Sequence, residues 1–159
     1  WRSPLPRWPT ISDLGQYDGV ASINEFPGGL AVWSQGGGVV VLDPSNGSEI
    51  YNRVMEFGDK VCDVTHCQEA GWLVMLHGGT VATMGKIESE YSIHTTNGPV
   101  MDSEFVDGRW VWTGWRHDGD LSEGEVGSRP RDNIGVALLG KMVLSNDGTW
   151  SEWSGPNPT

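Results

Sequence analysis

Three segments of this 159-residue sequence repeat one pattern, and this repeat constrains the fold more than any other feature. The segments cover residues 20–26, 61–67 and 100–106, so their opening valines lie 41 and 39 residues apart. A turn that contains glycine follows each segment, and a second apolar run begins ten or eleven residues after the opening valine. The spacing therefore indicates one structural unit of about forty residues that is used three times.

Each unit has room for four short strands. The expected second, third and fourth strands follow in order along each unit: 30–34, 39–42 and 50–57; 72–77, 80–84 and 90–95; 110–115, 134–139 and 149–153. Asn46-Gly47 and Asp147-Gly148 are dipeptides that tight hairpin turns prefer. We predict an all-β fold of three antiparallel four-strand meanders that resemble propeller blades, and a β-sandwich is the alternative.

The repeat divides the chain into two parts. Residues 1–18 alternate proline with tryptophan and arginine, which favours an extended arm. We predict that Trp1 and Trp8 of this arm dock on a neighbouring subunit, and a poorly packed terminus is the alternative. Residues 19–159 form the β-repeat domain, whose units we place at about 19–59, 60–98 and 99–154.

Charge and hydropathy exclude several classes of partner. The net charge of −11 argues against nucleic acid and anionic membranes, because binding to phosphates needs clustered lysine and arginine. No apolar run approaches the roughly 18 residues that span a bilayer, so we expect a soluble protein without a membrane span.

Cys62 and Cys67 are separated by four residues, one of which is His66. Structural zinc needs a second pair of ligands, so the sequence predicts no metal site here. A short disulfide and two small buried side chains near a strand end are the interpretations that remain.

A polar insertion, residues 117–133, separates the second and third strands of the last unit. Its acidic and glycine residues suit calcium in kind, but the acids do not follow the spacing of a known calcium loop. We therefore interpret the insertion as a solvated loop and predict no cofactor.

The last unit also carries short motifs that resemble a known family. They are Asp107-Gly108-Arg109-Trp110, Thr113-Gly114-Trp115, Ile134-Gly135-Val136-Ala137 and Ser145-Asn146-Asp147-Gly148-Thr149-Trp150-Ser151-Glu152. The last motif is similar to the Asp-box of sialidases, Ser-x-Asp-x-Gly-x-Thr-Trp, with one residue missing. The stretch also resembles a blade of the arabinanase-type five-bladed glycosidases. The resemblance covers about a third of the chain and implies a propeller in which Asp147 caps its turn and Trp150 packs between blades.

If the resemblance extended to catalysis, a pair of carboxylates would be needed as acid and base or nucleophile. Asp63 and Asp102 occupy the same repeat position on first strands, and Glu104 points to the same side as Asp102. The third equivalent residue is Ser22, and the arginines that would clamp a sialidase substrate are scattered. We therefore favour a protein that is not an enzyme and keep the three acids as the catalytic candidates.

Tryptophan side chains are the other candidates for ligand binding, because their rings stack on sugar faces. Four of the nine tryptophans lie on expected second strands, where we predict a core role: Trp33, Trp72, Trp110 and Trp112. Trp115, Trp150 and Trp153 border the insertion and the closing turn, and are the candidates for an exposed glycan site.

Three units are fewer than the about four to eight blades of closed propellers. Two open sheet faces would remain, and such faces are association sites. We therefore predict a structural or interaction module of a multi-subunit assembly, with other subunits or copies of itself as partners, in a virion or extracellular particle. The alternative is a carbohydrate-binding or glycoside-hydrolase propeller segment of a secreted protein.

Overall fold

The computed structural model describes residues 19–153, and within them the chain forms three antiparallel sheets and no helix. The first sheet contains β1 (Val20–Phe26), β2 (Gly29–Ser34), β3 (Gly38–Leu42) and β4 (Glu49–Val54). The second contains β5 (Val61–Cys67), β6 (Gly71–Leu76), β7 (Thr80–Met84) and β8 (Ser92–Thr95). The third contains β9 (Val100–Val106), β10 (Arg109–Ser122), β11 (Glu125–Leu139), β12 (Met142–Ser145) and β13 (Trp150–Glu152).

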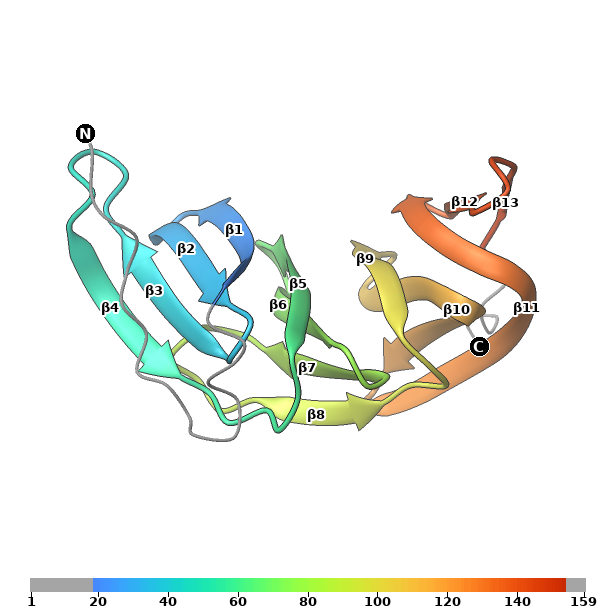
Figure 1. The fold of residues 1–159 in the computed structure, drawn as a ribbon, viewed down its shortest axis with the longest axis horizontal. Coiled ribbons are helices and arrows are strands. Elements are labelled where there is room, and N and C mark those ends of the chain that lie inside the picture. Colours follow the sequence, from blue (N-terminus) through green and yellow to red (C-terminus); the bar gives the residue numbers. More distant parts are fainter. Residues whose placement is uncertain (1–18, 154–159) are drawn as a thin grey trace.

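The three sheets stand side by side in an open fan (Figure 1). The first strands are neighbours in space, with β1 next to β5 and β5 next to β9. The all-β prediction is confirmed, with three sheets in place of the two of a sandwich. The arm with Trp1 and Trp8 lies outside the described residues. In the described part of the chain, no helix has the length and apolar character to cross a membrane.

The sequence repeat is also a repeat of backbone geometry. Each first strand is seven residues long and begins at the valine that opens its unit. Pairing with the second strand shifts at one equivalent residue in every sheet, which is Ala21, Cys62 or Met101. An extra residue at this position is a β-bulge, which bends the strand and increases its twist. The three units therefore share strand length, register and bend.

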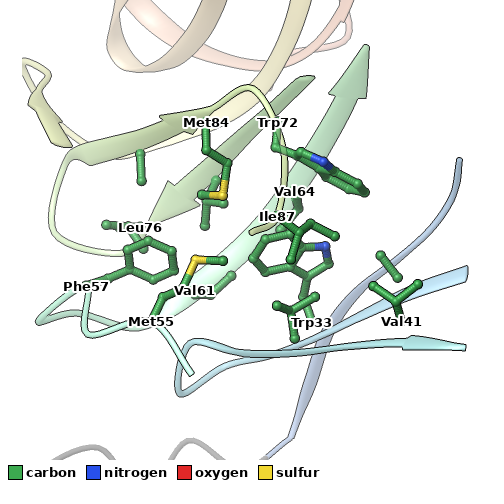
Figure 2. Close-up of a cluster of buried hydrophobic side chains, with 14 residues drawn as sticks. Trp33, Val41, Met55, Phe57, Val61, Val64, Trp72, Leu76, Met84 and Ile87 are labelled. Carbon is green, nitrogen blue, oxygen red and sulfur yellow. The ribbon is translucent and has the colours of Figure 1, made fainter. Parts of the chain in front are cut away.

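The central strand of the middle sheet, β6, is buried on both faces. Trp72, Val74 and Leu76 pack toward the first sheet, where the ring of Trp33 lies 5.4 Å from that of Trp72 (Figure 2). The alternate residues of β6 pack toward the third sheet, against Trp110 and Trp112. All four of these tryptophans are buried, so the predicted core role is confirmed. Each buried tryptophan contributes about 4–6 kcal/mol of transfer free energy, from about 150–250 Å² of area.

Side chains on the first strands tie each sheet to the next. The amide of Asn24 donates a hydrogen bond to the carbonyl oxygen of Val64 at 3.2 Å. The hydroxyl of Thr65 donates to the carbonyl oxygen of Ser103 at 3.4 Å. Asn24 and Thr65 are the fifth residues of their strands, and the two acceptors are the fourth residues of theirs. One repeat position therefore bonds to one repeat position of the following sheet.

The third sheet departs from the pattern. The expectation of a solvated loop over residues 117–133 is wrong, because β10 and β11 extend to 14 and 15 residues and pair as one long hairpin. Four strands were also expected in this unit, but β12 adds a fifth. The polar segment forms strands because two of its aspartates, Asp118 and Asp120, pair with arginines inside the sheet.

Candidate functional site

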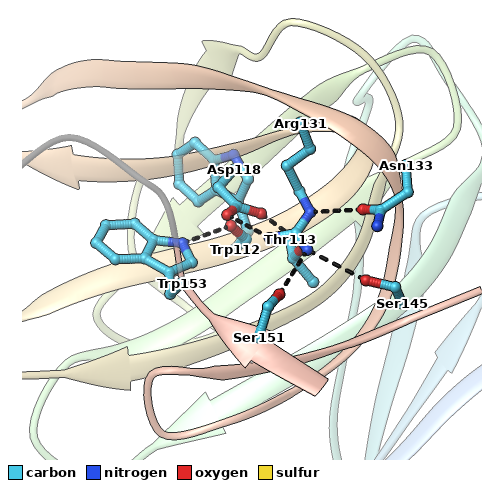
Figure 3. A network of polar contacts seen from close by, with 8 residues as sticks. All are labelled: Trp112, Thr113, Asp118, Arg131, Asn133, Ser145, Ser151 and Trp153. Atoms are coloured by element: carbon cyan, nitrogen blue, oxygen red, sulfur yellow. Dashed lines mark hydrogen bonds and ion pairs between the residues drawn. The ribbon is translucent and has the colours of Figure 1, made fainter. Parts of the chain in front are cut away.

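The long hairpin holds a buried ion pair at its centre. Arg131 Nη1 lies 2.8 Å from Asp118 Oδ2, and the two side chains are 6% and 0% exposed. The hydroxyl of Thr113 donates a hydrogen bond to the other oxygen of Asp118 at 2.7 Å. The remaining donors of Arg131 reach three neutral acceptors at 3.1–3.2 Å, on Asn133, Ser145 and Ser151 (Figure 3). One guanidinium therefore joins β10, β11, β12 and β13.

A bulge in β10 brings these groups together. Thr113 and Asp118 are five residues apart, so in a regular strand they would face opposite sides of the sheet. Arg116 has a φ of 61°, and the register shifts between Trp115 and His117. The extra residue turns Asp118 to the side of Thr113. A side chain at Gly135 would overlap the Thr113 hydroxyl, so glycine in β11 leaves room for the network.

A second ion pair joins the first residue of β10 to a residue near the tip of the hairpin. Arg109 Nη1 lies 2.5 Å from Asp120 Oδ2, and both side chains are almost fully buried. The guanidinium of Arg109 also lies 5.5 Å from the ring centroid of Trp153, a distance at which a cation and an aromatic face attract. The Trp153 indole donates a hydrogen bond to the carbonyl oxygen of Trp112 at 3.1 Å. Trp153 is therefore a packing residue of the third sheet, although sequence placed it with the exposed candidates.

The other two tryptophan candidates are exposed. Trp115 and Trp150 each leave 53% of their surface open to solvent. Trp115 shares the face of Thr113, whereas Trp150 alternates with Ser151 and points away from the Arg131 network. The two rings therefore lie on opposite faces and form no common platform.

In the Asp-box turn, Asp147 caps the turn as predicted, but Trp150 does not pack as predicted. Asp147 Oδ1 accepts hydrogen bonds from the Thr149 amide at 3.0 Å and from the Thr149 hydroxyl at 2.6 Å. These hydrogen bonds lower the pKa of Asp147. The expectation that Trp150 packs between blades is wrong, because half of its surface is exposed on the last strand.

The three candidate acids accept hydrogen bonds from the backbone. The Asp102 carboxylate accepts from the Leu138 amide at 2.7 Å, and that of Glu104 accepts from the Gly140 amide at 2.6 Å. Both acids thus lie on one side of β9, as expected, and hold the end of β11. The exposed Asp63 accepts from its neighbour Val64 at 2.8 Å.

Burial determines the electrostatics of this group. Desolvation raises the pKa of Asp102, the negative charge of Asp63 raises it further, and the two amide hydrogen bonds oppose the shift. Desolvation likewise raises the pKa of Glu104. A carboxyl of this kind retains its proton to higher pH and can serve as an acid, but the contacts described above make Asp102 and Glu104 acceptors for β11.

Metal binding and disulfide formation are the two interpretations that concern Cys62 and Cys67 on β5. Among residues 19–153, no group of three or more histidine, cysteine, aspartate or glutamate side chains is placed to hold a metal ion. Cys62 and Cys67 lie on one strand five residues apart, which is about 16 Å at the rise of a β-strand. The disulfide interpretation is wrong, because a disulfide requires α-carbons within about 7 Å. Cys62 is also exposed, which contradicts the buried interpretation for that residue.

Sequence reasoning missed the two arginines of the hairpin, Arg109 and Arg131. For Arg131 the signal was the alternation of charged residues on both sides of Glu123-Gly124, because a period of two is typical of strands. Comparison with protein-family models and with curated proteins gives no match for this chain.

Proposed function

We propose that this chain is a structural or interaction module of a multi-subunit assembly. The observation that supports the proposal is the distribution of exposed apolar side chains. Large exposed hydrophobic residues of the first sheet are Val20, Ile23, Ile50 and Tyr51, and those of the third are Met101, Trp115, Leu139, Met142 and Trp150. Within residues 19–153 the middle sheet contributes Ile93 alone to this group. The surface suited to association therefore lies on the two terminal sheets.

The last three strands carry a group of apolar side chains on one face of the sheet. Leu139 pairs with Met142, and Leu144 pairs with Trp150. Val143 is fully buried, so Met142 and Leu144 point to the opposite side, away from the interior. We call Leu139, Met142, Leu144 and Trp150 the apolar strip. Beside it, β13 is an edge strand of the sheet, and edge strands offer free backbone groups to a partner.

Other subunits or copies of this chain would cover the terminal sheets and continue the fan toward a closed, propeller-like ring. An extracellular particle such as a virion is the setting that we propose. Exposed apolar surface and free strand edges are tolerated when they are buried in a permanent assembly.

Sedimentation velocity of the full chain over a wide concentration range tests the proposal. We expect an average mass that rises above that of one chain as the concentration increases. The double variant Leu139→Asn/Met142→Asn should weaken this association. The control Ile93→Asn changes an exposed apolar residue of the middle sheet and should not weaken it. A chain that stays monomeric at every concentration would contradict the proposal.

Carbohydrate binding is the second candidate, supported by the half-exposed rings of Trp115 and Trp150. Because the rings lie on opposite faces, each would serve as a separate stacking site. Binding to a glycan array and release of a chromogenic glycoside test this candidate. Trp115→Ala and Trp150→Ala should each remove part of the binding, and silence in both assays would exclude it.

A further inference from the structure

A cavity of about 320 Å³ lies between the first two sheets, and none of its lining residues belongs to the long hairpin. Three connections at the same end of these sheets form it: the β1–β2 turn, the β5–β6 turn and the loop from β7 to β8. The volume is at the lower end of the range for small-molecule sites, about 300–1,000 Å³, and suits a compact ligand.

Aromatic rings form the apolar wall of this cavity. The ring of Phe26 lies edge-on to those of His66 and Trp72, at centroid distances of 5.6 Å and 5.0 Å. The buried Trp72 backs the His66 ring at 4.4 Å. A side chain at Gly28 would overlap the ring of Phe26, so glycine at the edge of the cavity leaves room for that ring. This wall offers edges and faces to another aromatic ring.

The polar wall comes from an anchored loop. Ile87 is buried in the core, and Arg53 Nη1 donates hydrogen bonds to the carbonyl oxygens of Ile87 at 2.8 Å and Ser89 at 2.5 Å. The amide of Ser89 bonds back to the carbonyl oxygen of Lys86 at 3.0 Å. Lys86 and Glu88 therefore project from a fixed backbone on either side of a buried residue.

The two charges of this wall have no ionic partner in the described part of the chain. Lys86 and Glu88 both line the cavity, and among residues 19–153 neither forms an ion pair, with the other or with a third residue. Gln68 adds an amide to the lining. Burial lowers the pKa of His66 below 6.5, so the neutral form of its ring predominates at pH 7. The cavity thus presents one cation, one anion and an aromatic wall.

We propose that this cavity binds a zwitterionic α-amino acid with an aromatic side chain. The ligand carboxylate pairs with Lys86, its ammonium group pairs with Glu88, and its ring packs against Phe26 and His66. A phosphate or other polyanion finds one lysine opposed by a glutamate, and a purely apolar ligand leaves both charges without partners.

The test uses the full chain and three probes of one shape. L-Phenylalanine carries both charges, 2-phenylethylamine lacks the carboxylate, and 3-phenylpropionate lacks the ammonium group. Nuclear magnetic resonance titration follows the indole N–H of Trp72 and the side-chain amide of Gln68, which localises binding to the cavity. We expect phenylalanine to bind about tenfold more tightly than either analogue, because each analogue lacks one of the two charge-assisted contacts, and tenfold corresponds to about 1.4 kcal/mol.

Variants match each ligand charge to one residue. Lys86→Met should weaken phenylalanine binding to the level of 2-phenylethylamine and leave that amine unaffected. Glu88→Gln should weaken phenylalanine binding to the level of 3-phenylpropionate and leave the binding of 3-phenylpropionate unaffected. Glu90→Gln is the matched control, because Glu90 is exposed on the same connection but does not line the cavity. The proposal is overturned if phenylalanine does not bind, if it binds no better than the analogues, or if both variants behave like the control.

Discussion

Replacing Arg131 with methionine should destabilise the protein more than any surface substitution. The change removes the Arg131 guanidinium from the Asp118 carboxylate, whose side chain has no exposed surface and which also accepts a hydrogen bond from the Thr113 hydroxyl. Removing one member of a buried pair costs about 3–5 kcal/mol. A domain is stable by only about 5–15 kcal/mol, so this loss is a large share of the total. At about 2–4 °C per kcal/mol for a chain of this length, the melting temperature should fall by about 6–20 °C.

Urea and thermal unfolding of the full chain, followed by tryptophan fluorescence, measure this loss. Asp118→Asn provides the companion change, because it removes the charge and keeps a group that the Thr113 hydroxyl can reach. The double variant should lose less than the sum of the single losses, since no uncompensated ion remains buried. Lys141→Met is the control, because Lys141 and its partner Asp107 are mostly exposed and their pair should leave the midpoint unchanged.

Two results would refute this reasoning. One is an Arg131→Met variant that unfolds at the same urea concentration as the Lys141→Met control. The other is a double variant whose loss equals the sum of the two single losses, which would mean that Arg131 and Asp118 do not stabilise each other.

Three smaller predictions follow from other parts of the structure. Asn24→Ala removes the bond to Val64 between the first two sheets and should cost about 1 kcal/mol in urea unfolding; an unchanged midpoint would show that the bond contributes nothing. Burial lowers the pKa of both His66 and His94 from 6.5, so the unfolded chain takes up protons first and the free energy of unfolding should fall as the pH drops below 6.5; replacing both histidines with glutamine should flatten this slope, and a slope that persists would contradict the assignment. Asp147→Ala removes the brace of the last turn and should speed amide exchange there while leaving the first sheet unaffected; equal protection in both proteins would count against the brace.

The sequence by itself determined the repeated part of this protein. Strand bounds, glycine turns and the burial of Trp33, Trp72, Trp110 and Trp112 all follow from short-range patterns of alternation and turn residues. The opening valines marked the start of each first strand. These features are local, because a strand and its hairpin partner lie close together in the chain.

Only the tertiary structure decided which polar residues are buried and which partners they bind. A run such as 117–133 forms strands only if each buried charge meets an opposite one, and Asp118 meets Arg131 from across the hairpin, thirteen residues away. The same holds for Asp102 and Glu104, which could line an open channel but instead bond to β11 because that strand curls back against β9. Which tryptophan is exposed also depends on contacts between strands: Trp153 is held by Arg109, whereas Trp150 has no such cover. The environment of a polar side chain depends on partners that are distant in the sequence. The periodicity of the sequence does not identify those partners.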